Sequence, residues 1–185
     1  MNAVENHAPR FGFSISPGHP AGVAREVADA EAMGYERVGI WDSPTLFREP
    51  WVTLSAAAGA TRRISLGTWV TNPVTREPVV TASAAATLDD LAPGRVYLGI
   101  GAGATGVWHL GLPAATMPQL EEYIVAVRAL LEEGRARYDG RACPCSRPTS
   151  VTRRVSGRGA CRSSASSTCS RPIRPASWGS TRARA

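Results

Sequence analysis

Short apolar runs alternate with longer segments of helical periodicity along the first 140 residues of the chain. The strand-like runs are residues 11–15, 37–41, 64–70 and 95–100, which are short, apolar and bounded by turn residues. Helical spacing of apolar residues follows each of the first three runs, at Val23, Val27 and Ala30, then at Trp51, Leu54 and Ala58, then over residues 78–91. The pattern therefore predicts an α/β domain.

A last helix is predicted after the fourth strand. Thr116 and Gln119 have the spacing of a capping box, in which the two residues satisfy each other's backbone N–H groups. The expected apolar face consists of Leu120, Ile124, Val127 and Leu131, and Gly134 is expected to end the helix.

The four strand–helix units begin near residues 11, 37, 63 and 95. This spacing suits right-handed crossovers between parallel strands. Both a doubly wound open sheet and a (β/α)8 TIM barrel have this rhythm, and a complete barrel takes about 250 residues. We therefore predict that residues 1–140 form half of a TIM barrel, with about four βα units, followed by an irregular tail.

Half a barrel would leave its first and fourth strands as open edges. We expect the side chains of Phe13, Ile40, Leu66 and Leu98 to point inward and to lack the opposite wall that would bury them. Because open strand edges promote pairing with other chains, we expect a homo-oligomer or an aggregate.

Charge divides the chain sharply near residue 140. Residues 141–185 contain 10 arginines and no acid, whereas residues 1–140 contain 11 arginines and 15 acids, and the whole chain has a formal charge of +6. The basic part has no Leu, Phe or Met, which is too little apolar material to offset the entropy of ordering. We therefore expect residues 141–185 to be a disordered Arg/Ser/Pro/Cys-rich tail. Its composition is that of GC-rich DNA read out of frame, so another frame near codon 141 should continue the strand and helix pattern.

The tail also contains all four cysteines, Cys143, Cys145, Cys161 and Cys169. Their spacings lack the two-to-four-residue separation of a zinc knuckle, so we expect no metal. Its arginines could meet phosphates, but Trp178 is the tail's only aromatic residue, which disfavours nucleic acid. A basic-tailed nucleic-acid binder and a nonenzymatic, unstable fragment remain alternative interpretations. With no apolar run of membrane-spanning length and no signal-peptide pattern, we expect a cytoplasmic protein and no membrane partner.

Polar residues follow the predicted strands, where sites in parallel sheets lie. Asp42 comes directly after the second strand and either accepts hydrogen bonds from a ligand or caps the next helix. Asn72, before Pro73, either shapes a turn or contacts a ligand. His19 and His109 are loop histidines for which a proton-donor role is the less favoured alternative.

Residues 101–106 fit the dinucleotide-binding pattern G-x-G-x-x-G after a strand. An NAD(P)-dependent Rossmann dehydrogenase is therefore a further alternative. The context is poor, because Gly111 and Pro113 interrupt the helix that should follow and the motif falls in the fourth unit rather than the first. The glycines do permit a close approach of the backbone to a ligand.

Two longer strings are more specific when they occur together. Residues 66–73 read L-G-T-x-V-T-N-P, and residues 94–103 read G-R-V-x-L-G-I-G-x-G. With Ile40-Trp41-Asp42-Ser43 and the segments 31–38 and 81–91, they resemble the luciferase-like monooxygenase superfamily over residues 11 to about 140. The resemblance is greatest to the branch of methylenetetrahydromethanopterin reductase and other enzymes that use the deazaflavin coenzyme F420.

The resemblance implies an oxidoreductase with a (β/α)8 barrel, which holds FMN or coenzyme F420 at its carboxyl rim and acts on a small-molecule substrate by hydride transfer or monooxygenation. It implies that Asp42 contacts the cofactor and that a non-prolyl cis peptide between Trp69 and Val70 backs the ring. The cofactor-binding residues expected on this basis are Asp42, Trp69, Val70, Asn72, Gly101 and Gly103.

The chain departs from the family pattern in two ways. Ala104 stands where this branch commonly has an acid, so no catalytic residue is assigned. The phosphate-binding loops of the second half of the barrel have no counterpart. We therefore expect the chain to be truncated and inactive as given.

Overall fold

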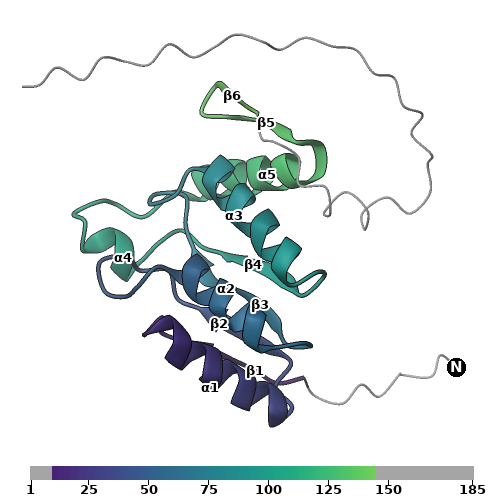
Figure 1. Cartoon of the computed structure of the whole chain (residues 1–185). Helices are drawn as coiled ribbons and strands as arrows, with labels where there is room; N and C mark the ends of the chain where they lie inside the picture. The colour runs from purple at the N-terminus through teal and green to yellow at the C-terminus, as the bar shows by residue number, and fades with distance from the viewer. Residues whose placement is uncertain (1–9, 145–185) are drawn as a thin grey trace, which may run out of the picture.

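The computed structural model of the chain describes residues 10–144 (Figure 1). Its main sheet has four parallel strands, β1 (Gly12–Ile15), β2 (Arg37–Ile40), β3 (Ser65–Thr71) and β4 (Val96–Ile100). The helices are α1 (Pro20–Ala32), α2 (Pro50–Ala60), α3 (Pro78–Leu91), the one-turn α4 (Thr105–Trp108) and α5 (Met117–Glu133). The predicted α/β class and its four strand–helix units are confirmed.

The strands pair in the order β1-β2-β3-β4, the same as their order along the chain. Helix α1 packs on α2, α2 on α3 and α3 on α5, so the helices form a continuous layer beside the sheet (Figure 1). A doubly wound sheet reverses its strand order and places helices on both faces. The sequential order within residues 10–144 therefore argues against the Rossmann alternative and matches part of a TIM barrel.

The ends of α5 are as predicted, and its predicted apolar face is partly buried. The side-chain oxygen of Gln119 accepts a hydrogen bond from the backbone N of Thr116 at 2.9 Å, and Gly134 ends the helix with a φ of 73°. Of the predicted apolar face, Val127 is buried, whereas Leu120, Ile124 and Leu131 are half-buried. Helix α5 packs against α3 and against the segment that follows it. The other buried residues of α5 are Tyr123, Ala126 and Leu130. None of the helices within residues 10–144 is long and apolar enough to span a membrane.

A hairpin that the sequence analysis did not predict follows α5. Strands β5 (Arg135–Tyr138) and β6 (Arg141–Pro144) pair antiparallel around Asp139 and Gly140, whose φ angles are 50° and 68°. Asp-Gly with two positive φ angles is the sequence typical of a type I′ hairpin turn, so the signal was present. The predicted boundary at residue 140 falls in this turn. The remainder of the predicted tail, including Cys145, Cys161, Cys169 and Trp178, lies outside the described residues.

The main core lies between the sheet and the helix layer. Ile40 and Leu66 are fully buried there, and Phe13 and Leu98 pack against the same cluster. The prediction that these four side chains point into the barrel is therefore wrong. Side chains alternate along a strand, and the opposite, inner face carries the intervening positions, among them Ser14, Arg37, Gly39, Gly67, Trp69, Tyr97 and Gly99.

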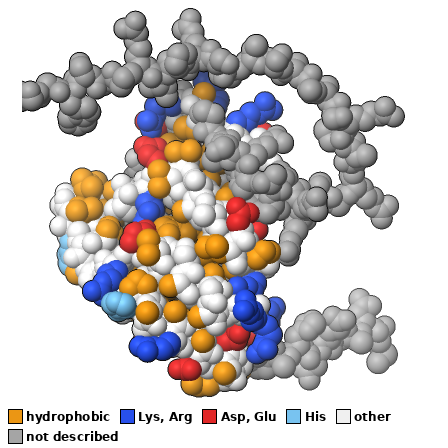
Figure 2. Space-filling view, viewed as in Figure 1, with side chains coloured by type: hydrophobic (Ala, Val, Ile, Leu, Met, Phe, Trp, Pro, Cys, Tyr) orange, Lys and Arg blue, Asp and Glu red, His pale blue; other side chains and the backbone are white. Residues whose placement is uncertain are grey.

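The solvent side of the helix layer carries exposed apolar residues. Its exposed apolar residues are single ones, such as Val52 on α2, Val80 on α3 and Val125 on α5. Charged side chains are interspersed with apolar ones over the face shown in Figure 2. Scattered apolar residues of this kind are ordinary for a protein surface.

We expect the chain to self-associate through its sheet edges. Among the described residues, β1 pairs only with β2 and β4 only with β3, so each has one unpaired side. Sedimentation velocity at several protein concentrations should show species larger than the 19.5 kDa monomer. A monodisperse monomer with a cooperative thermal transition would contradict this expectation.

Glu31, near the end of α1, holds the turn that leads into β3. Its carboxylate accepts hydrogen bonds from the backbone N atoms of Arg62, Arg63 and Ile64, the shortest at 2.6 Å. Burial raises the pKa of Glu31, but the three backbone hydrogen bonds outweigh burial and leave this pKa below its ordinary value. The carboxylate form is therefore the one that stabilises the fold.

Replacing Glu31 by glutamine should lower the free energy of unfolding by about 1.5–3 kcal/mol at neutral pH, the range for hydrogen bonds to a charged group. Because the folded pKa is depressed, the wild-type advantage is fully present above the unfolded pKa and is lost as the pH falls through the folded pKa. Urea unfolding of both proteins at neutral and acidic pH measures this difference. An advantage that grows on acidification would contradict the assignment.

Candidate functional site

A hollow of about 330 Å3 opens at the carboxyl ends of β2, β3 and β4. Five of the six residues predicted for the cofactor line it, and the sixth, Gly101, neighbours the lining residue Val70. The lining residues are Trp41, Asp42, Ser43, Trp69, Val70, Asn72, Ala102, Gly103, Ala104, Thr105 and Gly106. The structure thus brings together residues that are up to 65 positions apart in the sequence.

The expected cis peptide is present between Trp69 and Val70. It lies where the pairing of β3 with β4 shifts its register, between Thr68 and Thr71. Trp69 and Val70 are 54% and 40% exposed, so both present apolar surface to the hollow. The predicted cis peptide bond between Trp69 and Val70 is confirmed.

Asp42 is buried and already has protein partners. Its Oδ2 accepts hydrogen bonds from Thr71 Oγ1 at 2.8 Å and from Arg76 Nε at 2.7 Å. Its Oδ1 has only a long contact of 3.4 Å with Arg76. Asp42 is not the cap of α2, because Glu49 holds that position and accepts from the backbone N of Val52. The Asp42 side chain is fully buried, so its carboxylate holds the rim together through Thr71 and Arg76.

Arg76 joins two carboxylates at this edge of the sheet. It pairs with Asp42 and with Glu49, and its side chain is 17% exposed. Burial lowers the pKa of Arg76, but the hydrogen bonds and charges of Asp42 and Glu49 outweigh it and raise this pKa above its ordinary value. The guanidinium therefore stays charged. Arg76 was not predicted as a site residue, because the sequence does not show that Asp42 is buried and needs a cation.

Asn72 shapes the turn after β3. Its side-chain Oδ1 accepts hydrogen bonds from the backbone N atoms of Val74 and Thr75, both at 3.0 Å. The turn-forming role left open by the sequence is thus observed. The side-chain amide nitrogen has no hydrogen-bond partner among residues 10–144, so a donor remains for a ligand in the hollow.

The two glycines of the wall make room for this chain's own side chains. A Cβ at Gly103, whose φ is 96°, would lie 2.5 Å from Val107 Cγ2. A Cβ at Gly101 would lie 2.8 Å from Val70 Cγ2. Contacts with the chain's own side chains therefore explain the glycine at both positions, without the close approach of a ligand.

The two loop histidines do not line the hollow. His19 is exposed at the N-cap of α1, and His109 is exposed at the C-cap of α4. The α4 segment does approach the rim, because Thr105 Oγ1 lies 3.4 Å from Ser43 Oγ across it. Neither histidine is placed to transfer a proton in the hollow.

The strand order and the position of the rim hollow match part of a TIM-barrel fold. The sequence profile of the luciferase-like monooxygenases matches residues 4–183, and the chain belongs to that family. Over 95 residues it is 43% identical to an uncharacterized protein of Mycobacterium tuberculosis, which covers 50% of this chain and 34% of that protein.

Two solved structures have the same fold. The coenzyme F420-dependent tetrahydromethanopterin reductase of Methanopyrus kandleri is 27% identical, with a TM-score of 0.67 over 76% of this chain and 46% of that chain. The oxygenating constituent of 3,6-diketocamphane monooxygenase from Pseudomonas putida, in complex with FMN, is 18% identical, with a TM-score of 0.61 over 76% and 44%. The chain thus spans about half the length of these structures and a third of its curated relative.

Proposed function

We propose that this chain is the amino-terminal half of a luciferase-like oxidoreductase and that its rim hollow receives the ring of FMN or coenzyme F420. The observation that carries the proposal is the convergence of Asp42, Trp69, Val70, Asn72 and Gly103 on one hollow at the strand ends. The similarity to an F420-dependent reductase and to an FMN complex supports the cofactor class.

Each lining residue has a defined part in this proposal. Trp69 and Val70 supply an apolar surface behind a planar ring, the Asn72 amide nitrogen donates a hydrogen bond, and the buried Asp42 carboxylate fixes the rim through Thr71 and Arg76. A flavin or deazaflavin supplies hydride chemistry when bound. The side chains named here bind and orient the ring and exclude water on one side, and none of them is assigned a proton transfer.

The hollow is bounded only by β2, β3, β4 and the α4 segment. Hydride transfer needs a donor and an acceptor held about 3–3.5 Å apart, which requires a rim closed on all sides. Arg76, which is bonded to the lining residue Asp42, is engaged by Asp42 and Glu49 and is not free for a phosphate. We therefore propose that the 185-residue chain is truncated and inactive, and that the completed barrel acts on a small-molecule substrate.

The test is a fluorescence titration of the purified chain with FMN and with coenzyme F420. We expect no detectable binding at roughly micromolar concentrations, where about 8 kcal/mol of binding free energy would be needed. The same titration should show binding once the second half is restored in frame. Tight binding by the 185-residue chain would show that this half is sufficient, and absence of binding by the restored protein would overturn the proposed site.

A further inference from the structure

Two hydroxyl groups meet in the rim hollow. Ser43, which follows β2, and Thr105, which begins α4, both line it, and Ser43 Oγ lies 3.4 Å from Thr105 Oγ1. Hydroxyls that bond well to each other are about 2.5–3.0 Å apart, so each of these keeps most of its capacity to donate. A ligand oxygen between them can lie about 2.8 Å from both. The pair therefore offers two donors to one acceptor oxygen.

Asn72 adds a third uncharged donor to the hollow. Its Oδ1 accepts from the backbone N atoms of Val74 and Thr75 and from Thr75 Oγ1, which fixes the orientation of the amide. Asn72 is only 2% exposed, yet among the described residues Trp51 Nε1 is the one fully enclosed side-chain polar atom without a partner. The Asn72 nitrogen is therefore open to the hollow. The proposed function assigns this donor to the cofactor ring, which leaves the hydroxyl pair for a substrate.

The charges next to the hollow disfavour a charged substrate. Asp42 is the one lining residue with an ionisable side chain, and that side chain has no exposed surface with which to pair a cation. Asp42 and Glu49 share the guanidinium of Arg76, so two carboxylates stand against one cation and the group is disfavourable to an anion. A charged head group would lose its hydration here and find no partner.

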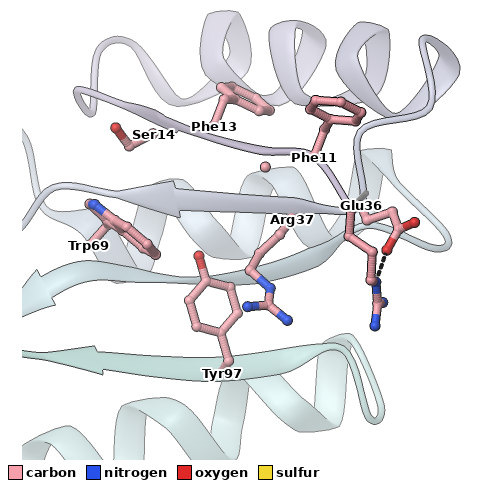
Figure 3. Close-up of a pocket in the computed structure, with 9 residues that line it drawn as sticks. Phe11, Phe13, Ser14, Glu36, Arg37, Trp69 and Tyr97 are labelled. Atoms are coloured by element: carbon pink, nitrogen blue, oxygen red, sulfur yellow. Dashed lines mark hydrogen bonds and ion pairs between the residues drawn. The ribbon is translucent and has the colours of Figure 1, made fainter. Parts of the chain in front are cut away.

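The charged residues of the inner sheet face lie away from the rim hollow. A second hollow, of about 470 Å3, lies on that face, and Trp69 lines both hollows (Figure 3). Its charged residues are Arg10, Glu36 and Arg37, which stand at the amino ends of β1 and β2, and Arg10 is paired with Glu36 (Figure 3). The hydroxyl pair is at the opposite, carboxyl ends of the strands. These charges therefore do not change the neutral character of the rim hollow.

An apolar wall stands beside the hydroxyl pair. Trp41 directly follows β2, lines the hollow and is 39% exposed. Its ring packs edge-on against Phe47, with the ring centres 5.5 Å apart, which restricts its orientation. Trp69 and Val70, the proposed backing of the cofactor ring, come from β3 instead. Apolar walls with a few polar groups that fix orientation are typical of small-molecule sites.

We propose that Ser43 and Thr105 together bind the carbonyl oxygen of an uncharged substrate whose apolar body lies against Trp41. A carbonyl oxygen has two lone pairs and accepts from both hydroxyls at once. This inference rests on the proposed function, because it assigns the substrate class of the same hollow. The two hydroxyls hold and orient the substrate, and neither is assigned a proton transfer.

The test is saturation-transfer difference NMR on the full chain without cofactor, a ligand-observed method that tolerates self-association. Three probes share a phenyl ring and differ in the head group: acetophenone, benzoate and benzylammonium. Acetophenone should bind in the millimolar range, and the two charged probes at least about tenfold more weakly, because a charge finds no partner in the hollow. Replacing both hydroxyls, by Ser43→Ala with Thr105→Val, should weaken acetophenone binding at least about fivefold. Thr87→Val, which removes an exposed hydroxyl of α3, is the matched control and should change nothing.

Four results would overturn the proposal: no binding of acetophenone by the wild-type chain, equal binding of either charged probe, unchanged acetophenone binding by the double variant, or the same loss with Thr87→Val. If circular dichroism shows that the double variant is unfolded, Ser43→Ala and Thr105→Val are compared singly with the wild type, and each should weaken binding. The cofactor titration of the completed barrel fails separately. Acetophenone binding here without cofactor binding there would overturn the proposed function and leave the hydroxyl site, and the reverse would overturn the hydroxyl site alone.

Discussion

Replacing Arg76 by methionine should lower the free energy of unfolding by about 3–5 kcal/mol, the largest electrostatic effect we expect in this chain. Methionine keeps much of the aliphatic length but leaves the buried Asp42 carboxylate without its cation. Thr71 would remain as a donor to Oδ2, which is one hydrogen bond for a fully buried charge. The loss should appear as a lower midpoint in urea, with unfolding followed by circular dichroism.

Two further variants show whether the loss comes from the unpaired charge. Arg128→Met removes an exposed arginine from α5 and should change stability by less than about 0.5 kcal/mol. Adding Asp42→Leu to Arg76→Met removes the stranded carboxylate and should recover most of the loss, since apolar replacement of a buried ion pair is often neutral. If the double variant is less stable than Arg76→Met, packing rather than charge holds this part of the fold.

The elements of this fold could be predicted because each has a local signal. Strand and helix periodicity, the Thr116 capping box and the stop at Gly134 all act within a few residues. The face to which each strand side chain points was not local information. An apolar side chain such as Ile40 or Leu66 could be buried on either face of the sheet. Which face it takes depends on how the helices pack on the sheet. The Asp139-Gly140 turn was a local signal that the sequence analysis did not use.

The position of the candidate site could be predicted from the topology of the sheet. Parallel strands bring their carboxyl ends to one rim, which gathers Asp42, Asn72 and Gly103 without any knowledge of their contacts. The contacts themselves were not predictable. Arg76, which pairs with Asp42, lies 34 residues away from it in the sequence. The side-chain oxygen of Asn72 accepts hydrogen bonds from the backbone N atoms of Val74 and Thr75. A residue placed at the right rim can thus be engaged in holding the rim together.

Replacing Gly99 by alanine should disrupt the pairing of β3 with β4 and destabilise the chain by about 3 kcal/mol or more. A Cβ at this position would overlap the backbone oxygen of Thr68 and would lie 3.2 Å from Val70 Cγ1. The overlap cannot be relieved by a rotamer change, because the obstacle is backbone at the register shift between Thr68 and Thr71. Gly59→Ala is the matched control: it lies in α2, meets nothing within 4 Å, and should leave stability unchanged or raise it by up to about 1 kcal/mol. Equal urea midpoints for the two variants would show that β3 and β4 are not held as closely as this structure has them.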